Sequence, residues 1–212
     1  MFKVIRMVKR GEKSLPEFKQ EWLERNRELK RAANKVVASV AAEGKVLGDE
    51  APPYDGIAAI YFSTAQTARA AADKGLGAEA ISVVAEEKVL FARPDADKIL
   101  KAQGQLKVVL TVQRKKDLTS AKFKDAWVKS HAKIEHKVLL ESPLQKLVAS
   151  FAVPEEGKTP DFDGMVELYF ASTDDIKATF GGPIPGMLRK DEETYVQMDA
   201  PEIRIIAEEY VL

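Results

Sequence analysis

The feature that most constrains this fold is an internal repeat whose period is about half of the chain. Three short motifs occur once in each half, in the same order: Lys35–Ala41 and Lys146–Ala152, Tyr54–Phe62 and Phe162–Phe170, and the aromatic pairs Phe18/Trp22 and Phe123/Trp127. The spacing between copies drifts by a few residues, as expected if loop lengths differ. A period of this size indicates two fused copies of one domain, not a solenoid of short repeats.

The length of 212 residues fits two small domains, which we place at residues 1–103 and 104–212. Acidic and basic residues balance at 33 each, so there is no long-range field that would attract nucleic acid. Cysteine is absent, which excludes disulfides and thiolate chemistry. We find no apolar run of transmembrane length and no signal peptide, and we expect a cytoplasmic protein that does not bind membranes.

Each half reads as strand, helix, strand, strand, helix, strand. In the first half we expect strands at 2–10, 36–42 and 56–62 and helices at 14–29 and 64–74, the first helix opening with a capping box at Ser14-Leu-Pro-Glu17. Its last strand is either 83–91 or 96–102. In the second half we expect strands at 106–114, 146–153, 164–170 and 202–211, helices at 119–140 and 173–180, and a stiff loop at 181–186 that could rim a cavity.

This element order predicts an α+β fold of two tandem ferredoxin-like βαββαβ repeats. Each sheet would carry helices on one face, and the two bare faces would cover each other by packing sheet against sheet. The natural pocket is then the space between the sheets.

Period-two alternation predicts which residues face that space. Strand 164–170 places Glu167 and Tyr169 inward, and strand 56–62 places Tyr61 inward. In the first strand of each half we expect Ile5, Met7, Leu110 and Val112 to lie under the helices. The residues that alternate with them would then face the pocket. The polar residues predicted to line the pocket are Arg6, Tyr61, Thr111, Gln113, Glu167 and Tyr169.

Histidine sharpens the prediction, because the chain has only two. His131 follows Trp127 by four residues and therefore shares the apolar face of its helix. The first half has Asn26 where the second has His131, and Ala59 where the second has Glu167. An imidazole and a carboxylate that converge on one cavity can perform general acid–base chemistry. We therefore predict one active pocket, in the second half, with His131 and Glu167 as its catalytic pair.

Structural explanations compete with this reading. His131 could be a hydrogen-bonded core residue, and Glu167 could form a structural ion pair with Arg6. Tyr61 and Tyr169 occur in both copies, which favours packing, and Asp55 and Asp163 precede glycine in turns that need no function. No metal-binding pattern is visible, because two histidines five residues apart on a helix do not share a face.

Together, the first strand Phe2–Arg10, the Phe-x-x-x-Trp helix, the Trp-x-x-x-His-Ala motif ending at Ala132 and the Asp-Gly strand resemble the EthD family. The second half matches both family motifs, including Glu167, whereas the first half departs at Asn26 and Ala59. The resemblance implies a dimeric α+β barrel in which the fused copies stand in for a homodimer. It also implies a small, often aromatic or phenolic, ligand without fixing the reaction.

We therefore expect a cofactor-independent lyase, dehydratase or cyclase. His131 would move a proton, Glu167 would orient or assist it, and Arg6 or Tyr169 would stabilise a developing phenolate or enolate. The alternative is a non-catalytic binding or accessory protein for a hydrophobic small molecule. Haem binding through His131 is a third option, and a homodimer of the whole chain is possible.

Overall fold

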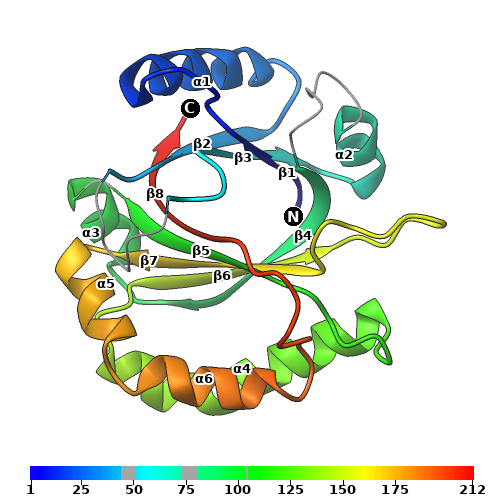
Figure 1. Ribbon diagram of the computed structural model, residues 1–212, viewed down its shortest axis with the longest axis vertical. Helices are drawn as coiled ribbons and strands as arrows, with labels where there is room; N and C mark the ends of the chain where they lie inside the picture. Colours follow the sequence, from blue (N-terminus) through cyan, green and yellow to red (C-terminus); the bar gives the residue numbers. More distant parts are fainter. Residues whose placement is uncertain (44–50, 73–80, 104) are drawn as a thin grey trace.

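The protein forms a closed antiparallel barrel of eight strands in the order β1-β3-β2-β8-β5-β7-β6-β4 (Figure 1). The computed structural model describes residues 1–43, 51–72, 81–103 and 105–212, except for the side chains of 103 and 131–139. The strands are β1 (Phe2–Val8), β2 (Lys35–Ala41), β3 (Gly56–Phe62), β4 (Ile81–Ala92), β5 (Leu106–Val112), β6 (Lys146–Ala152), β7 (Gly164–Phe170) and β8 (Arg204–Val211). The helices are α1 (Leu15–Leu29), α2 (Ala65–Ala72), α3 (Ala96–Gln103), α4 (Ser120–Glu141), α5 (Thr173–Phe180) and α6 (Ile184–Glu192).

The strand order is the same in each half of the chain. The first half runs β4-β1-β3-β2 and the second runs β8-β5-β7-β6. The halves join where β2 pairs with β8 and where the far end of β4 pairs with β6, so both seams carry backbone hydrogen bonds. The last strand of the first half is β4, as in the 83–91 alternative, and residues 96–103 form helix α3 instead.

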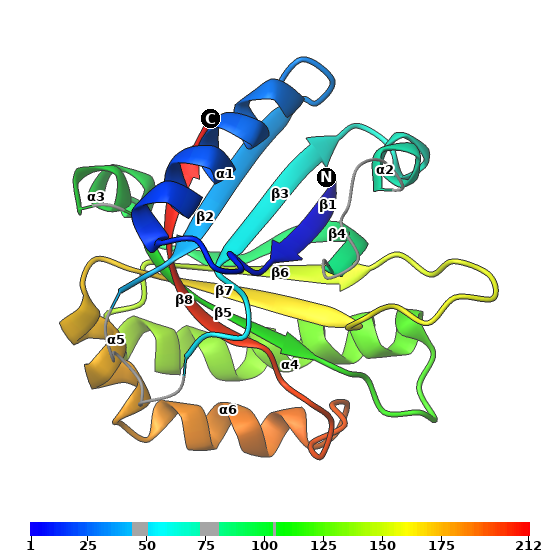
Figure 2. The same ribbon diagram turned by 45° about the horizontal axis from the view of Figure 1, so that its top comes forward.

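The helices lie outside the barrel, and each half carries its own set. Helices α1 and α2 cover the first half, and α4, α5 and α6 cover the second (Figures 1 and 2). None of the described helices has the combination of length and apolar character needed to cross a membrane. Helix α3 differs from the others, because its Leu100 packs against Val148 and Tyr169 at one end of the barrel.

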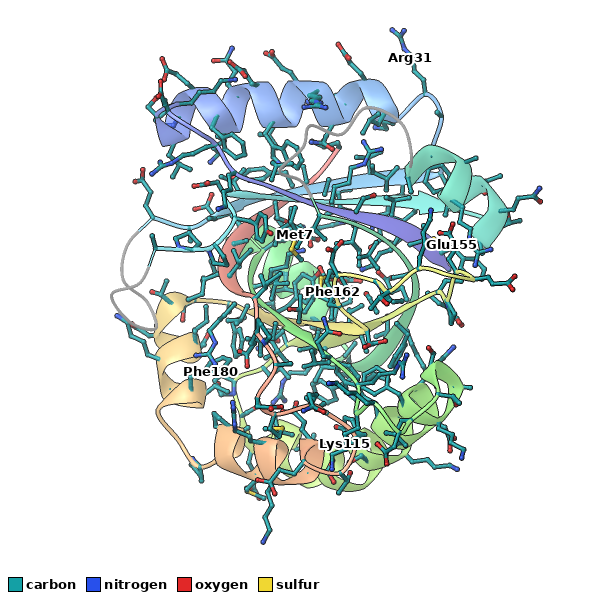
Figure 3. All side chains as sticks on the ribbon, turned by 45° about the vertical axis from the view of Figure 1, so that its right-hand side comes forward. Met7, Arg31, Lys115, Glu155, Phe162 and Phe180 are labelled. Carbon is teal, nitrogen blue, oxygen red and sulfur yellow. The ribbon has the colours of Figure 1, made fainter. Side chains whose placement is uncertain are left out.

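The barrel interior is filled by apolar side chains from both halves. Ile5, Met7 and Ile57 from the first half pack with Val109 and Met165 from the second. Met7 and Phe162 lie inside the barrel in Figure 3. The two sheets therefore share one core, and this apolar part of the space between them is packed.

The prediction for the faces of β1 was wrong. Ile5 and Met7 point into the barrel, whereas Val4 packs with Ala68 of α2 on the outside. Arg6 also lies outside, where it donates a hydrogen bond to the carbonyl oxygen of Ala71 at 2.8 Å. Both faces of β1 are apolar, so its alternation could be read in either phase. In β3, β5 and β7 the predicted faces agree with the apolar clusters of the structure.

The Asp-Gly motifs have a packing role in both halves. A Cβ on Gly164 would lie 2.2 Å from Cζ3 of Trp127, and one on Gly56 would lie 2.8 Å from Cζ of Phe18. Glycine at these positions lets the aromatic pair of the covering helix rest on the strand. The preceding Asp163 accepts hydrogen bonds from the backbone N–H and the side chain of Arg114 at 3.0 and 2.9 Å.

Candidate functional site

Glu167 lies inside the barrel between two buried lysines. Its Oε2 accepts a hydrogen bond from Nζ of Lys3 at 2.8 Å, and its Oε1 accepts one from Nζ of Lys107 at 2.6 Å. Lys3 comes from β1 and Lys107 from β5, so this carboxylate joins the two halves of the chain. All three residues are essentially inaccessible to solvent, at 0–2% exposure.

Each of the two lysines pairs with a second glutamate, and that glutamate accepts a hydrogen bond from a tyrosine. Lys3 also pairs with Glu87 at 2.8 Å, and Glu87 accepts a hydrogen bond from the Tyr61 hydroxyl at 2.7 Å. In the second half Lys107 pairs with Glu209 at 2.7 Å, and Glu209 accepts a hydrogen bond from the Tyr169 hydroxyl at 2.8 Å. We call these seven residues the interior network: Lys3, Tyr61, Glu87, Lys107, Glu167, Tyr169 and Glu209.

The interior network holds its central groups in their charged forms. Burial by itself would raise the pKa of Glu167, but the ammonium groups of Lys107 and Lys3 hold that pKa well below its usual value. Burial would lower the pKa of both lysines, and the surrounding carboxylates raise it above the usual value. Burial beside Glu167 raises the pKa of Tyr61 and Tyr169, so both phenols stay neutral and donate.

The other residues predicted for the site are dispersed. Arg6 is outside the barrel, next to α2. The Thr111 hydroxyl accepts a hydrogen bond from the backbone N–H of Ile203 at 3.1 Å. Gln113 lies beyond the end of β5 and donates to the carbonyl oxygen of Asp161 at 2.6 Å. His131 belongs to α4, but its side chain is outside the described residues.

A cleft of about 550 Å³ lies on the outer side of the second half, not between the sheets. Its floor is the outer face of β5 and β7, with Leu110, Leu168 and Phe170, and α5 and α6 form its walls. Phe180 of α5, labelled in Figure 3, is one of its lining residues. We call it the α5–α6 cleft. Its volume is that of a typical small-molecule site.

The loop predicted at 181–186 contributes to this cleft in part as a helix. Residues Gly181, Ile184, Pro185 and Gly186 line the cleft, but α6 begins at Ile184. Pro185 falls in the first turn of α6, where its missing N–H costs no hydrogen bond. Proline and glycine in this segment therefore mark a helix start.

One end of the α5–α6 cleft is charged. Glu202 accepts hydrogen bonds from Nε and Nη2 of Arg204 at 3.3 and 3.0 Å and lies 3.9 Å from Arg189. Glu192 also lines the cleft there, and its carboxylate makes no hydrogen bond or ion pair with any described residue. Burial, together with the carboxylates of Glu202 and Asp191, raises the pKa of Glu192 to about 7.

Thr179 adds a second polar group to the same cleft. It is 7% exposed, and its Oγ1 is buried without a hydrogen-bond partner in the structure. Because buried hydroxyls are normally hydrogen-bonded, an unused one in a cleft wall is a candidate contact for a ligand.

Lys3, Lys107 and Glu192 were not predicted from the sequence. Lys107 shares the inward face of β5 with Val109, so the alternation already placed it inside. Lys3 was not predicted, because the face of β1 that bears Lys3, Ile5 and Met7 was assigned to the helices and not to the barrel interior. Glu192 stands in the charged run Arg189–Glu193, which is typical of a solvated helix face, and nothing in the sequence singles it out. Among the described residues no group of three or more His, Cys, Asp or Glu could hold a metal ion.

Comparison with known proteins supports the fold, and the matching family model covers part of the second half. Residues 115–199 match the family model described as the EthD domain, and a search of curated proteins finds no match. The chain is similar to the crystal structure of an anthrone oxidase-like protein, with a TM-score of 0.65, 7% identity, and coverage of 99% of this chain and 92% of that one. A mutant chlorite dismutase from Candidatus Nitrospira defluvii gives a TM-score of 0.46 at 11% identity, over 98% of this chain and 91% of that one. The first likeness shows the α+β barrel fold alone, because proteins that share a fold can differ in function.

Proposed function

We propose that this protein binds a small aromatic or phenolic molecule in the α5–α6 cleft and processes it by acid–base chemistry, as a cofactor-independent lyase, dehydratase or cyclase. The observation that carries the proposal is the cleft itself. An apolar floor of Leu110, Leu168 and Phe170 suits a flat ring system, and the charged end near Arg204 suits its oxygen substituents. The EthD match, which spans α4 to α6, supports a site in this half of the chain.

His131 remains the proton-transfer residue in this proposal. It is carried by α4, which packs beside α6, one wall of the cleft. An imidazole titrates near neutral pH and can act as either acid or base. Glu167 has both carboxylate oxygens engaged by lysines, which favours a structural role over the assisting role expected from the sequence.

We further propose that the halves, 1–103 and 104–212, are tandem ferredoxin-like copies of one domain, fused where a related protein would form a dimer. The identical strand orders support this, and so do the matched positions of Lys3 and Lys107 and of Gly56 and Gly164.

Binding in the cleft can be tested with adjacent residues of α6. Leu188 lines the cleft, whereas Met187 is 49% exposed and does not. We expect Leu188→Trp to weaken the binding of 4-nitrophenol and larger phenols at least about tenfold, because the indole occupies ligand space. Met187→Trp should bind as the wild type does. Calorimetric titration measures both, and equal binding by all three proteins would contradict the proposal.

The chemistry can be tested with the two histidines of α4. We expect His131→Asn to slow the reaction by about 10²–10⁴-fold, the usual contribution of a general acid or base. His136→Asn is the matched control and should leave the rate unchanged. The assay follows loss of water or ring closure in a panel of hydroxylated aromatics by mass spectrometry. Full activity of a folded His131→Asn protein would rule out this role.

The alternative is a binding or accessory protein without catalysis. One observation favours it, because Glu167 is neutralised by Lys3 and Lys107 and is unsuited to proton transfer. This alternative predicts that phenols bind in the cleft, that Leu188→Trp weakens their binding, and that no aromatic compound in the panel is converted.

A further inference from the structure

The α5–α6 cleft contains a carboxyl group that the protein leaves uncommitted. Each neighbouring charged group at that end has a partner: Glu202 binds Arg204 and lies near Arg189. The carboxylate of Glu192 makes no hydrogen bond or ion pair with a described residue, although Glu192 lines the cleft and is half-buried. A carboxylate in such surroundings loses hydration without gaining a donor, which is costly unless a ligand supplies one.

The position of Glu192 in α6 adds to this effect. It is the last residue of the helix, where the partial negative charge of the helix end disfavours an anion. Glu202 and Asp191 place two further negative groups nearby, and Arg189 alone of the named neighbours opposes them. Lys177 and Arg204 are the other charged residues among the described lining of the cleft. The raised pKa of about 7 is consistent with this geometry.

The other helical wall of the cleft carries the second uncommitted group. Thr179 belongs to α5, whereas Glu192 ends α6, and both residues line the cleft. The floor of the cleft is apolar. The cleft therefore offers an apolar ligand one hydrogen-bonding group from each of the two helices.

We propose that Glu192 exchanges the hydroxyl proton of a phenolic ligand, while Thr179 of α5 hydrogen-bonds a second oxygen of the same ligand. This inference rests on the proposed function of the cleft and names its ligand as a phenol with a second oxygen that accepts a hydrogen bond. The proton moves from the phenol to the Glu192 carboxylate, which leaves a phenolate beside a neutral carboxylic acid, and it returns before release. No electron transfer or further reactant takes part.

The test uses 4-nitrophenol, whose phenolate has its own visible absorption and whose nitro oxygens can accept from Thr179. The complex forms only when Glu192 and the phenol together hold one proton, because a carboxylate and a phenolate would repel each other. Wild-type affinity should therefore fall about tenfold per pH unit above about pH 8. In Glu192→Gln the amide donates to the phenolate, so affinity should no longer fall and bound phenolate should be seen in the visible spectrum.

Two further variants keep the result interpretable. Glu193→Gln changes the next residue, which is exposed, and should retain the wild-type pH profile. Thr179→Val removes the hydroxyl on the α5 wall at nearly constant shape and should weaken binding about threefold to tenfold at every pH. An identical fall in affinity with pH in wild type and Glu192→Gln would overturn the inference while leaving the cleft as the binding site. Absence of saturable binding to the wild type, or undiminished binding by Leu188→Trp, would instead refute the proposed function.

Discussion

Two glutamates of the second half show how strongly local surroundings set the chemistry of one residue type. Glu167 is buried between two ammonium groups, which keep it charged and hold its pKa well below the usual value. Glu192 is half-buried beside the carboxylates of Glu202 and Asp191 at a helix end, and these surroundings raise its pKa to about 7. The first is suited to permanent ion pairing and the second to proton exchange near neutral pH.

At the residue scale we predict that Glu167→Gln lowers the free energy of unfolding at pH 7 by about 3 kcal/mol, because Lys3 and Lys107 each lose a buried partner. The folded-state pKa of Glu167 lies below its unfolded value of 4.5, so its stabilising contribution is present above that pH and is lost as the pH falls further. Wild type and variant should therefore converge in stability at acidic pH. Urea unfolding at several pH values measures this.

Glu155→Gln is the matched control. Glu155 forms a surface ion pair with Lys158 at 2.7 Å, and its side chain is 46% exposed. Exposed pairs contribute little, so this variant should change stability by less than about 1 kcal/mol. A pH-independent difference between wild type and Glu167→Gln would contradict the assigned charge state.

At the element scale, the repeated motifs predicted most helices and strands, and physical reasons explain where prediction failed. The capping box at Ser14 is present, with Glu17 closing it. The faces of β1 could not be assigned, because Lys3 and Arg6 give each face one cation among apolar residues. Lys3 lies inside, where the carboxylates of Glu87 and Glu167 reach it, whereas Arg6 lies outside and donates to the carbonyl oxygen of Ala71. That information is in the tertiary structure and not in the strand.

Helix α6 and the α5–α6 cleft also could not be predicted from the sequence pattern. The segment Gly181–Gly186 contains three glycines and two prolines, which predict a loop, and the charged residues that follow predict a solvated surface. The cleft arises only when α5 and α6 are placed over β5 and β7. The sequence predicted a pocket between the sheets, and the α5–α6 cleft on the outer side of the second half was not predicted.

At the element scale we predict that the close contact between α4 and β7 leaves no space for a side chain larger than glycine at position 164. Gly164→Ala would bring a Cβ to 2.2 Å from Trp127, in a site with no free volume, and we expect it to destabilise the protein by about 1–3 kcal/mol. Gly186→Ala in α6 is the control, since a Cβ there meets nothing within 4 Å, and it should be neutral or stabilising by up to about 1 kcal/mol. Urea unfolding followed by tryptophan fluorescence compares the two. Equal stability of both variants would show that Trp127 can move aside.

At the scale of the whole molecule, the two halves share one interior and two hydrogen-bonded seams. The apolar core mixes residues of both halves, and Glu167 binds a lysine from each. Neither half therefore has a complete core of its own, and we expect the chain to unfold as a single cooperative unit.

The chain offers one tryptophan in each half to test this. Trp22→Phe leaves Trp127 as a reporter of the second half, and Trp127→Phe leaves Trp22 as a reporter of the first. In each variant, the urea midpoint from fluorescence should coincide with the midpoint from far-ultraviolet circular dichroism, which reports on both halves. Separate midpoints within one variant would show that the halves unfold independently.

The central position of Glu167 makes the two halves non-interchangeable. The interior network contains two ammonium groups and three carboxylates: Lys3 and Glu87 from one half, and Lys107, Glu167 and Glu209 from the other. A barrel built from two first halves would match two cations with two anions, and one built from two second halves would confront two cations with four anions. The bridging carboxylate of Glu167 therefore favours the pairing of a first half with a second half over the pairing of two identical halves.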